Sequence, residues 1–473
     1  MDLSTLTITA ARKALDAKEY SALELTDAYL EQIAKKDKEI HAYLEVWEKS
    51  AREEAKAADK IIAKGESKPL TGIPLAIKDN ILVEGRTASS ASKILENYVA
   101  SYDATVVKKL KEQGAVFLGR TNMDEFALGG STENSAFGPT KNPHDTSRVP
   151  GGTSGGSTAA VAAHMALAAL GSDTGGSIRQ PSAFCGVVGL KPTYGAVSRF
   201  GLMAAASSLD QIGAIANTIE DAKLVFEAIR GHDDNDSTSL PDSSIYGTKK
   251  RQKVIGVPRA FLKEGMEPNM LAQFERTVEA LKKDGYSIVD VELPSLQYAL
   301  AVYYIVNPAE VSTNLARYDG IRYGLSVPAE DISAVYSKTR GAGFGPETRR
   351  RILVGTFVLS AGYADAYYRK ARAVRELIRE DFRRVFESVD AIALPTSPIA
   401  PWKFGEKADP LAMYAADIFT VPVNLAGVPA ISVPSGTVVR DGKELPVGFQ
   451  LIASHGGEET LFAIGEEVEK AGE

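Results

Sequence analysis

The chain has 473 residues, of which 44% are hydrophobic and 24% are charged, and its formal net charge is −7. These values are ordinary for a protein with a well-packed core and exclude a disordered or fibrous chain. No apolar run reaches the roughly 18 residues that a membrane span needs, and Met1–Tyr20 lacks the apolar block of a signal peptide. We expect an enzyme-sized cytoplasmic protein.

The charged and metal-binding residue types exclude further classes. Short basic clusters occur at Lys249–Arg251 and Arg349–Arg351, but no long basic stripe supports direct nucleic-acid binding. Cys185 is the single cysteine, which excludes an internal disulfide and a Cys-rich metal site. No two of the five histidines have metal-ligand spacing. We therefore expect chemistry that uses neither a metal nor cysteine.

Residues 1–65 are predicted to form a helical N-terminal segment. Ser21–Glu24 has the pattern of a capping box, which predicts that a helix begins there. Glu48–Ile62 is a second helix, rich in alanine and charged residues. We expect this segment to be a solvated appendage that packs against the rest of the chain.

From residue 66 to residue 473 strand and helix patterns alternate, which predicts one large α/β unit with a mostly buried sheet. His232–Gly247 is polar and rich in turn residues and is the best candidate for an internal linker. Strands are expected at Gly72–Ile77, Ala115–Leu118, Val254–Val257, Ser287–Leu293, Ala391–Leu394 and Val428–Val433, and helices at Ala104–Gln113, Asn269–Lys283 and Pro346–Phe386.

Two Gly/Ser/Thr loops, Gly151–Ser157 and Gly171–Ser177, flank the uncharged stretch Thr158–Leu170. That stretch is long enough for a short buried helix and a returning strand, which would bring both loops to one end of the sheet. Glycines let a backbone approach a ligand, and clustered N–H groups bind anions. The hydroxyls are candidate nucleophiles or proton relays.

Other interpretations of these motifs remain open. Gly171–Gly176 has the glycine spacing of a phosphate loop, but Ser177 stands where that loop needs lysine. Gly152–Gly156 matches the Gly-x-Ser-x-Gly elbow, with His455 as a late histidine, although no strand is predicted before it. Ser90–Lys93 matches Ser-x-x-Lys. Both glycine-rich loops are also compatible with simple tight turns.

Lys78 is the candidate general base, because it follows the apolar run Gly72–Ile77 directly. A lysine needs a lowered pKa to act as a base, and burial at the end of a strand lowers it. Ligands of α/β sheets also favour the carboxyl ends of strands.

The chain resembles the amidase signature family, which uses a Ser-cis-Ser-Lys triad. The residues that carry this resemblance are Lys78, Pro150–Ser157, Gly171–Gln180 and Phe184–Pro192. The resemblance implies a mixed β-sheet core covered by helices on both faces, formed by residues 66–473. Within the family, the chain is similar to the A subunits of glutamyl-tRNA(Gln)/aspartyl-tRNA(Asn) amidotransferases at Asn122–Asn134, Ser208–Gly213, Arg350–Tyr368 and Asp417–Pro434.

The resemblance assigns catalytic roles position by position. Ser177 would be the acyl nucleophile and neutral Lys78 the general base. Thr153 occupies the position of the bridging serine, a departure that keeps a hydroxyl but adds a methyl group. The backbone N–H groups of Thr174, Gly175 and Gly176, with that of the nucleophile, would form the oxyanion hole.

The same resemblance implies a subsite for a free amino acid. Arg351 would hold the glutamine α-carboxylate, Asp417 the α-ammonium, and Tyr303 would line the pocket. Two structural alternatives stay open: Arg351 on an exposed helix face beside Arg349 and Arg350, and Asp417 as a helix N-cap.

The implied activity is glutamine hydrolysis that supplies ammonia for converting Glu-tRNA(Gln), Asp-tRNA(Asn), or both, to the amidated tRNA. The implied partners are B and C subunits of a heterotrimer, in which ATP and Mg²⁺ act on the B subunit and this chain holds no cofactor. Two alternatives are a stand-alone amidase of small amides and a non-catalytic scaffold subunit in which Thr153 marks a decayed site.

Overall fold

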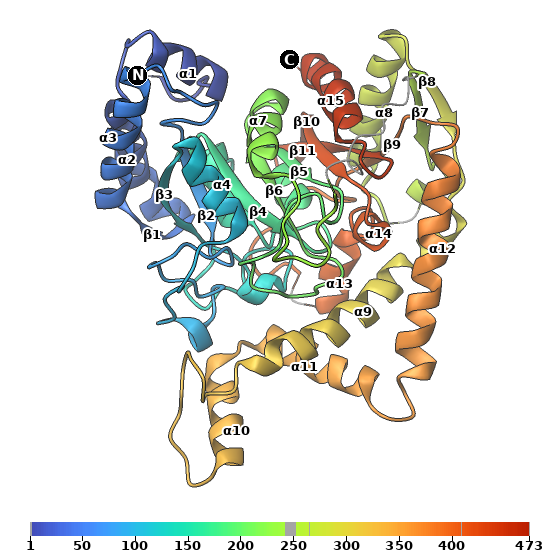
Figure 1. Ribbon diagram of the computed structural model, residues 1–473. Coiled ribbons are helices and arrows are strands. Elements are labelled where there is room, and N and C mark those ends of the chain that lie inside the picture. The colour runs from blue at the N-terminus through green and yellow to red at the C-terminus, as the bar shows by residue number, and fades with distance from the viewer. Residues whose placement is uncertain (1, 242–251, 264, 408, 473) are drawn as a thin grey trace.

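A mixed β-sheet runs through the middle of the molecule, as the computed structural model shows (Figure 1). The structure describes residues 2–241, 252–263, 265–407 and 409–472. In these residues the sheet has eleven strands in the order β1-β3-β2-β4-β6-β5-β10-β11-β9-β7-β8. The strands are β1 (Tyr43–Val46), β2 (Pro74–Lys78), β3 (Val116–Thr121), β4 (Ala168–Asp173), β5 (Val188–Lys191), β6 (Gln211–Ala216), β7 (Val254–Val257), β8 (Ser287–Asp290), β9 (Ala391–Pro395), β10 (Ala430–Arg440) and β11 (Lys443–Ala453).

The strand directions make the sheet mixed, as expected. Strands β3, β2 and β4 are parallel neighbours, and so are β9, β7 and β8. The pairs from β4 through β6, β5, β10 and β11 to β9 are all antiparallel. The carboxyl ends of β2 and β4 therefore lie at the same edge of the sheet, which decides where the polar loops meet.

Helices pack on the sheet in two groups. One group consists of α7, α8 and α15 (Figure 1), and the other consists of α5 and α6. The helices are α1 (Ile8–Asp16), α2 (Ala22–Ile40), α3 (Glu48–Ala63), α4 (Thr105–Gln113), α5 (Gly155–Ala162), α6 (Arg179–Cys185), α7 (Ile219–Ile229), α8 (Pro268–Lys283), α9 (Ala299–Asn314), α10 (Ile332–Gly343), α11 (Pro346–Leu359), α12 (Lys370–Val385), α13 (Pro410–Tyr414), α14 (Val421–Ala426) and α15 (Glu458–Gly472).

The N-terminal segment contains the expected helices and one strand that was not expected. The capping box at the start of α2 is present, with Ser21 and Glu24 each bonded to the other's backbone N–H. Tyr43–Val46, however, forms β1, which pairs antiparallel with β3 at the edge of the sheet. Four residues between two long helices give too short an alternation to be recognised as a strand. The segment is therefore joined to the sheet and is not a separate appendage.

Most other predicted elements are confirmed, with one difference among the helices. Thr158–Leu170 spans most of α5 and the first part of β4, with a tight return between them. The expected helix Pro346–Phe386 is interrupted after α11 and resumes through a short π-helical segment, Asp365–Arg369, into α12. Of the linker candidate His232–Gly247, residues 232–241 are irregular and the remainder lies outside the described residues.

Helices α9, α11 and α12 form an arm from which α10 projects away from the body (Figure 1). Helix α9 was not predicted, because its residues are apolar without a clear helical stripe. Gly355 allows α11 to lie directly on α9, since a Cβ atom at this position would lie 1.8 Å from the carbonyl oxygen of Pro308. This crossing fixes the position of Arg351 on α11 relative to Tyr303 and Tyr304 on α9.

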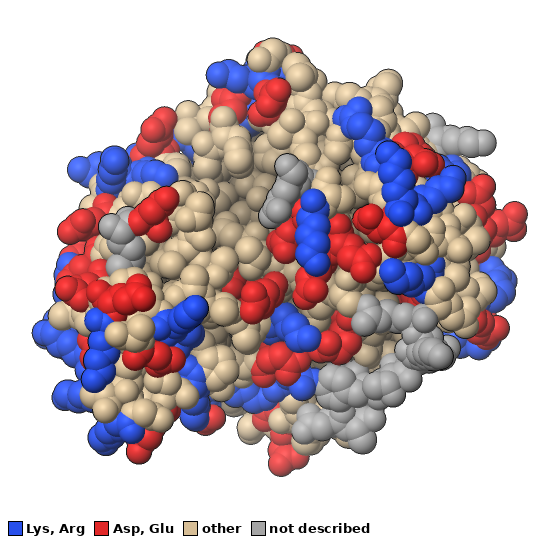
Figure 2. All heavy atoms as spheres, turned by 90° about the horizontal axis from the view of Figure 1, so that it is seen from above, with Lys and Arg blue, Asp and Glu red and all other residues tan. Residues whose placement is uncertain are grey.

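Two further expectations from the sequence concern the distribution of charge and the absence of membrane-spanning helices. On the face seen in Figure 2, acidic and basic side chains are interspersed, and no large area carries a single sign. Among the helices of the described ranges, none has the length and apolar character needed to cross a membrane.

We predict that Gly355→Ala destabilises the arm. The added methyl group must push α11 away from the Pro308 carbonyl, and overpacking of this kind typically costs about 1–3 kcal/mol. Thermal unfolding should show a lower midpoint for this variant. Gly341→Ala on α10 is the matched control, because a Cβ atom there meets nothing within 4 Å, and it should leave the midpoint unchanged or raise it. Equal midpoints for the two variants would contradict the described crossing.

Candidate active site

The parallel pair β2 and β4 brings three polar stretches together at one edge of the sheet. Lys78 is the last residue of β2, and β4 ends in Ser172 and Asp173. The loop that leads into α5 lies against both strand ends, and its Gly152–Thr153 peptide bond is cis. The residue at the position of the bridging serine, Thr153, is thus preceded by a cis peptide bond.

The amine of Lys78 is fully buried among hydroxyl groups. Its Nζ lies 2.8 Å from Thr153 Oγ1 and 2.8 Å from Ser154 Oγ. It also lies 2.9 Å from the Oγ of Ser172 and 3.3 Å from the carbonyl oxygen of the same residue. Asn80 Nδ2 donates to this Oγ at 2.9 Å and orients it. The amine thus has hydrogen-bond partners on the loop before α5 and at the end of β4.

Burial lowers the pKa of Lys78 to about 7, because a charged ammonium loses its hydration there. The carboxyl groups of Asp124, Asp173 and Asp210 oppose this shift but do not cancel it. A substantial fraction of Lys78 is therefore neutral at neutral pH. A neutral amine 2.8 Å from the Thr153 hydroxyl can accept a proton from it.

Ser177 lies at the end of the second glycine-rich loop and is 7% exposed. Its carbonyl oxygen accepts a hydrogen bond from the backbone N–H of Ser154 at 3.1 Å, which ties the two loops together. Within the described ranges its hydroxyl makes no hydrogen bond to the protein. The structure thus brings Lys78 and Thr153 into direct contact, and it places the backbone of Ser177 against Ser154, the residue after Thr153.

The expected oxyanion hole needs one correction. The N–H of Gly176 donates to Asp173 Oδ1 at 2.8 Å, so it is engaged within the protein and is not available to an oxyanion. In the part of the chain that the structure describes, the N–H groups of Thr174 and Gly175 make no such bond. These two, with the N–H of Ser177, are the remaining candidate donors.

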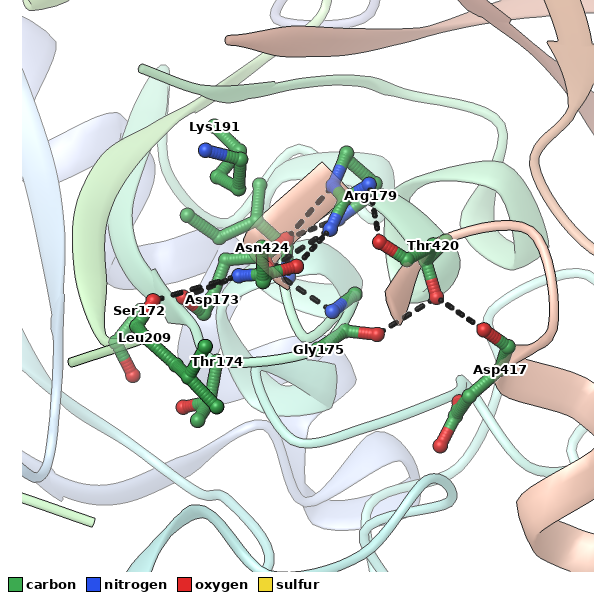
Figure 3. A network of polar contacts seen from close by, with 12 residues as sticks. Ser172, Asp173, Thr174, Gly175, Arg179, Lys191, Leu209, Asp417, Thr420 and Asn424 are labelled. Carbon is green, nitrogen blue, oxygen red and sulfur yellow. Dashed lines mark hydrogen bonds and ion pairs between the residues drawn. The ribbon is translucent and has the colours of Figure 1, made fainter. Parts of the chain in front are cut away.

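A buried ion pair holds this loop in place (Figure 3). Arg179 contacts both carboxylate oxygens of Asp173 at 3.0 Å, and both side chains are completely buried. Burial alone raises the pKa of Asp173, but the guanidinium outweighs it and holds this pKa well below the usual range. The remaining donors of Arg179 reach Asn424 Oδ1 at 2.6 Å, Gln450 Oε1 at 2.6 Å and the Thr420 carbonyl at 3.1 Å.

Thr420 connects the glycine loop to Asp417 (Figure 3). Its hydroxyl lies 2.6 Å from the carbonyl oxygen of Gly175 and 3.2 Å from that of Asp417. On the other side of the loop, Thr174 Oγ1 donates to Asp210 Oδ1 at 2.7 Å. The segment that carries the candidate oxyanion donors is therefore fixed from two directions.

Arg351 is buried, which excludes the alternative of an exposed helix face. Its side chain is 6% exposed, whereas the neighbouring Arg349 and Arg350 are exposed residues. Its Nε lies 2.7 Å from Glu347 Oε1 and its Nη1 lies 3.1 Å from Asn307 Oδ1. A buried guanidinium held by a carboxylate and an amide is oriented for binding a planar anion.

Asp417 and Tyr303 lie next to the loop of Gly175. The Asp417 carboxylate does not cap a helix: the N-cap of α14 is Thr420, and Asp417 Oδ2 accepts from the Tyr304 hydroxyl at 2.9 Å. Burial raises the pKa of Asp417 to about 7 against the opposing effects of Tyr304 and Arg351. Tyr303 packs on the loop, since a Cβ atom at Gly175 would lie 2.7 Å from its ring and hydroxyl.

Two of the competing motif interpretations do not fit the structure. Lys93 of the Ser-x-x-Lys match is exposed, and Ser90 is buried. In the described residues no strand leads directly into Gly152, so the elbow geometry is absent, and His455 lies exposed. Cys185 is buried, and burial raises the pKa of its thiol to about 12, which fits a small packing residue.

Several residues that build this site were not assigned an individual role from the sequence. They are Asn80, Ser154, Ser172, Arg179, Tyr304, Glu347, Thr420 and Asn424. Ser172 and Asn80 stand at or just after strand ends in the sequence, which was a usable signal. The contact of Ser172 with Lys78, and that of Asn80 with Ser172, follow only from the parallel pairing of β2 with β4. Thr420, Asn424 and Gln450, which accept hydrogen bonds from Arg179, lie more than 240 residues away from it along the chain.

Residues 24–462 match the amidase family, so the chain is a member of that family. The geometry agrees with this class: a buried lysine, two glycine-rich hydroxyl loops and a cis peptide bond. Among curated proteins, the A subunit of glutamyl-tRNA(Gln) amidotransferase from Moorella thermoacetica is 53% identical, over 98% of this chain and 96% of that protein. The A subunit from Desulfatibacillum aliphaticivorans is 51% identical over 100% and 98%.

Solved structures give the same result. The A subunit of glutamyl-tRNA(Gln) amidotransferase from Thermotoga maritima superposes with a TM-score of 0.81 at 42% identity, covering 99% of this chain and 95% of the other. The peptide amidase of Stenotrophomonas maltophilia has a TM-score of 0.82 at 29% identity, with 99% and 97% covered. The fold is therefore that of the amidases.

We predict that Arg179→Met destabilises the protein strongly, because it leaves Asp173 buried without its counter-charge. Breaking one side of a buried pair typically costs about 3–5 kcal/mol. Chemical unfolding should show a much lower midpoint. The double variant Asp173→Asn/Arg179→Met is the control and should recover part of the loss, since no unpaired charge remains. A wild-type midpoint for the single variant would contradict the role of the pair.

Proposed function

We propose that the chain is the glutamine-hydrolysing subunit of a tRNA-dependent amidotransferase. The observation that carries the proposal is the buried amine of Lys78, 2.8 Å from the Thr153 hydroxyl and beside the loop that ends in Ser177. The full-length similarity to the A subunits of glutamyl-tRNA(Gln) amidotransferases supports the same conclusion.

In the first step the Ser177 hydroxyl attacks the side-chain amide carbon of glutamine. Its proton passes to the oxygen of Thr153, while the proton of Thr153 passes to neutral Lys78, which becomes an ammonium. The carbonyl oxygen of the substrate becomes an oxyanion, which the N–H groups of Thr174 and Gly175 stabilise, at a typical value of about 3 kcal/mol per donor.

The tetrahedral intermediate then loses its amine. Lys78 returns the proton through Thr153 to the departing NH₂ group, so that ammonia leaves and Ser177 carries a γ-glutamyl ester. Water attacks this ester with neutral Lys78 again acting as the base through the same relay. The products are glutamate and free Ser177, and the sum of the steps is glutamine plus water giving glutamate plus ammonia.

Recognition of glutamine rests on the two charged groups at the ends of an amino acid. Arg351 binds the α-carboxylate and Asp417, when ionised, binds the α-ammonium. Tyr303 forms the wall between this subsite and the loop of Gly175. A stand-alone amidase of simple amides would not need this pair of opposite charges, and for that reason the subunit function is favoured.

The ammonia is passed to a partner in the same complex. We propose B and C subunits as the partners in a cytoplasmic heterotrimer, with ATP and Mg²⁺ acting on the B subunit to activate Glu-tRNA(Gln), Asp-tRNA(Asn), or both. This chain would supply only the glutaminase step and bind no cofactor. The formal net charge of −7 fits a chain that is not itself the principal tRNA-binding subunit, and on the face seen in Figure 2 the charges are of mixed sign.

We predict that Ser177→Ala and Lys78→Met each lower glutamine hydrolysis by at least about a thousandfold, since nucleophile and base act as a unit. Ammonia release by the complex purified from its native cells is the measurement. Circular dichroism and co-purification of the partner proteins control for folding. Activity of either folded variant within tenfold of wild type would refute the triad, and wild-type protein without any activity would favour the scaffold alternative.

We predict that Thr153→Ser keeps or raises the rate of glutamine hydrolysis. Serine preserves the hydroxyl that contacts Lys78 and removes a methyl group from a fully buried position. Thr153→Val is the matched control, because it keeps the shape but removes the hydroxyl, and it should abolish activity. A drop of more than tenfold for the serine variant would show that the threonine is specifically required.

A further inference from the structure

A pair of stacked tyrosines lies against Arg351 of the proposed amino-acid subsite, and one of the two also contacts Asp417. The rings of Tyr304 on α9 and Tyr414 on α13 are 3.9 Å apart at their centroids and inclined by 22°. The guanidinium of Arg351 lies 4.8 Å from the centre of the first ring and 4.7 Å from that of the second. Both rings therefore contact the same cation.

Tyr304 contacts both members of the charged pair. Its ring lies beside Arg351, and its hydroxyl donates to Asp417 Oδ2 at 2.9 Å. Tyr414 contacts only the cationic half of the subsite. Its hydroxyl donates to Glu347 Oε1 at 2.8 Å, and the same oxygen accepts from Arg351 Nε. Tyr304 is thus the side chain that links the cationic and the anionic half of the subsite.

This placement has a consequence for the two charges. Opposite charges in a buried site attract each other strongly, and two such side chains would form a direct ion pair if no other group separated them. In the ranges that the structure describes, Arg351 and Asp417 form no ion pair with each other. Arg351 is held by Glu347 and Asn307, and one oxygen of Asp417 is occupied by the Tyr304 hydroxyl.

We propose that Tyr304 is a specificity-determining positioning residue, which keeps Arg351 and Asp417 apart and oriented so that they select a free α-amino-acid amide. The inference rests on the proposed function, since it concerns the binding of glutamine. Tyr304 does not touch the reacting amide in this account. It acts through the two charged side chains, and its loss affects binding of the α-substituents and not the chemical step.

The hydrogen bond also sets the protonation of Asp417. The charged groups that act on this carboxyl are Arg351 and Arg179, which favour its ionised form, and Asp173, which opposes it. The Tyr304 hydroxyl is a further stabiliser of the ionised form, so removing it raises the pKa of Asp417 above its value of about 7. A protonated Asp417 carries no charge that attracts the α-ammonium, so glutamine binding weakens as the pH falls below the pKa of Asp417.

The test is steady-state glutamine hydrolysis by the purified complex with Tyr304→Phe, measured from pH 6 to pH 9. We expect KM to rise by about tenfold at pH 7 with kcat within about twofold of wild type. The acidic limb of kcat/KM should move to higher pH, while that of kcat, which follows Lys78 in the bound enzyme, should stay in place. Tyr363→Phe, an exposed tyrosine of the same arm, is the matched control and should behave as wild type.

The outcomes separate this inference from the proposed function. A wild-type KM and pH profile in Tyr304→Phe, or a fall of kcat without a change of KM, would overturn the role of Tyr304 while glutamine hydrolysis stands. An inactive wild-type complex would overturn the proposed function itself. If Tyr304→Phe fails to fold, Tyr414→Phe gives a second test: it should raise KM through Glu347 and Arg351 but leave the acidic limb in place, and a shift of that limb would contradict the proposed link through Tyr304.

Discussion

The burial of one lysine amine among hydroxyl groups is the constraint on which the site depends. A lysine at the end of an all-buried strand loses the hydration of its ammonium, and its pKa falls to about 7 although three carboxyl groups favour the charge. Such a group is stable only if hydrogen-bond acceptors surround it. Thr153, Ser154 and Ser172 meet this requirement and also form the path along which a proton can leave a nucleophile.

The loops around this amine need a support of their own, because glycine-rich segments are flexible. The buried pair of Asp173 and Arg179 provides it, since its donors and acceptors reach into the segments of Thr420, Asn424 and Gln450. The same pair engages the N–H of Gly176 and so decides which backbone groups remain for an oxyanion. One polar network therefore determines both the conformation of the loop and the backbone N–H groups that remain for an oxyanion. The residues of this network come from distant parts of the sequence.

The sequence predicted the elements next to the site better than the contacts within it. Strand β2 and the helix–strand unit of Thr158–Leu170 follow from hydrophobic pattern and glycine spacing alone. The position of Lys78 at a strand end was sufficient to suggest a base. The roles of Ser177, Thr153, Arg351 and Asp417 came from the resemblance, and they remain predictions, although the geometry is compatible with them.

What could not be predicted has a common physical origin. Strand β1 has only four residues, and helix α9 lacks a polar face, so neither has a clear period. The network of Arg179 and the tyrosine pair of α9 and α13 depend on packing between segments far apart in the sequence. The engagement of Gly176 depends on where the Asp173 carboxylate lies. No pattern in a single sequence contains such information.

Direct titration of the Lys78 amine tests the central claim. The protein would carry ¹⁵N at its lysine side chains, Lys78→Met would assign the resonance, and its chemical shift would be followed from pH 5 to pH 11. We predict a midpoint near the value of about 7 that burial imposes, so that the amine is largely neutral under working conditions. A midpoint at or above the ordinary lysine value of about 10.4 would show a permanently charged side chain and contradict its role as the base.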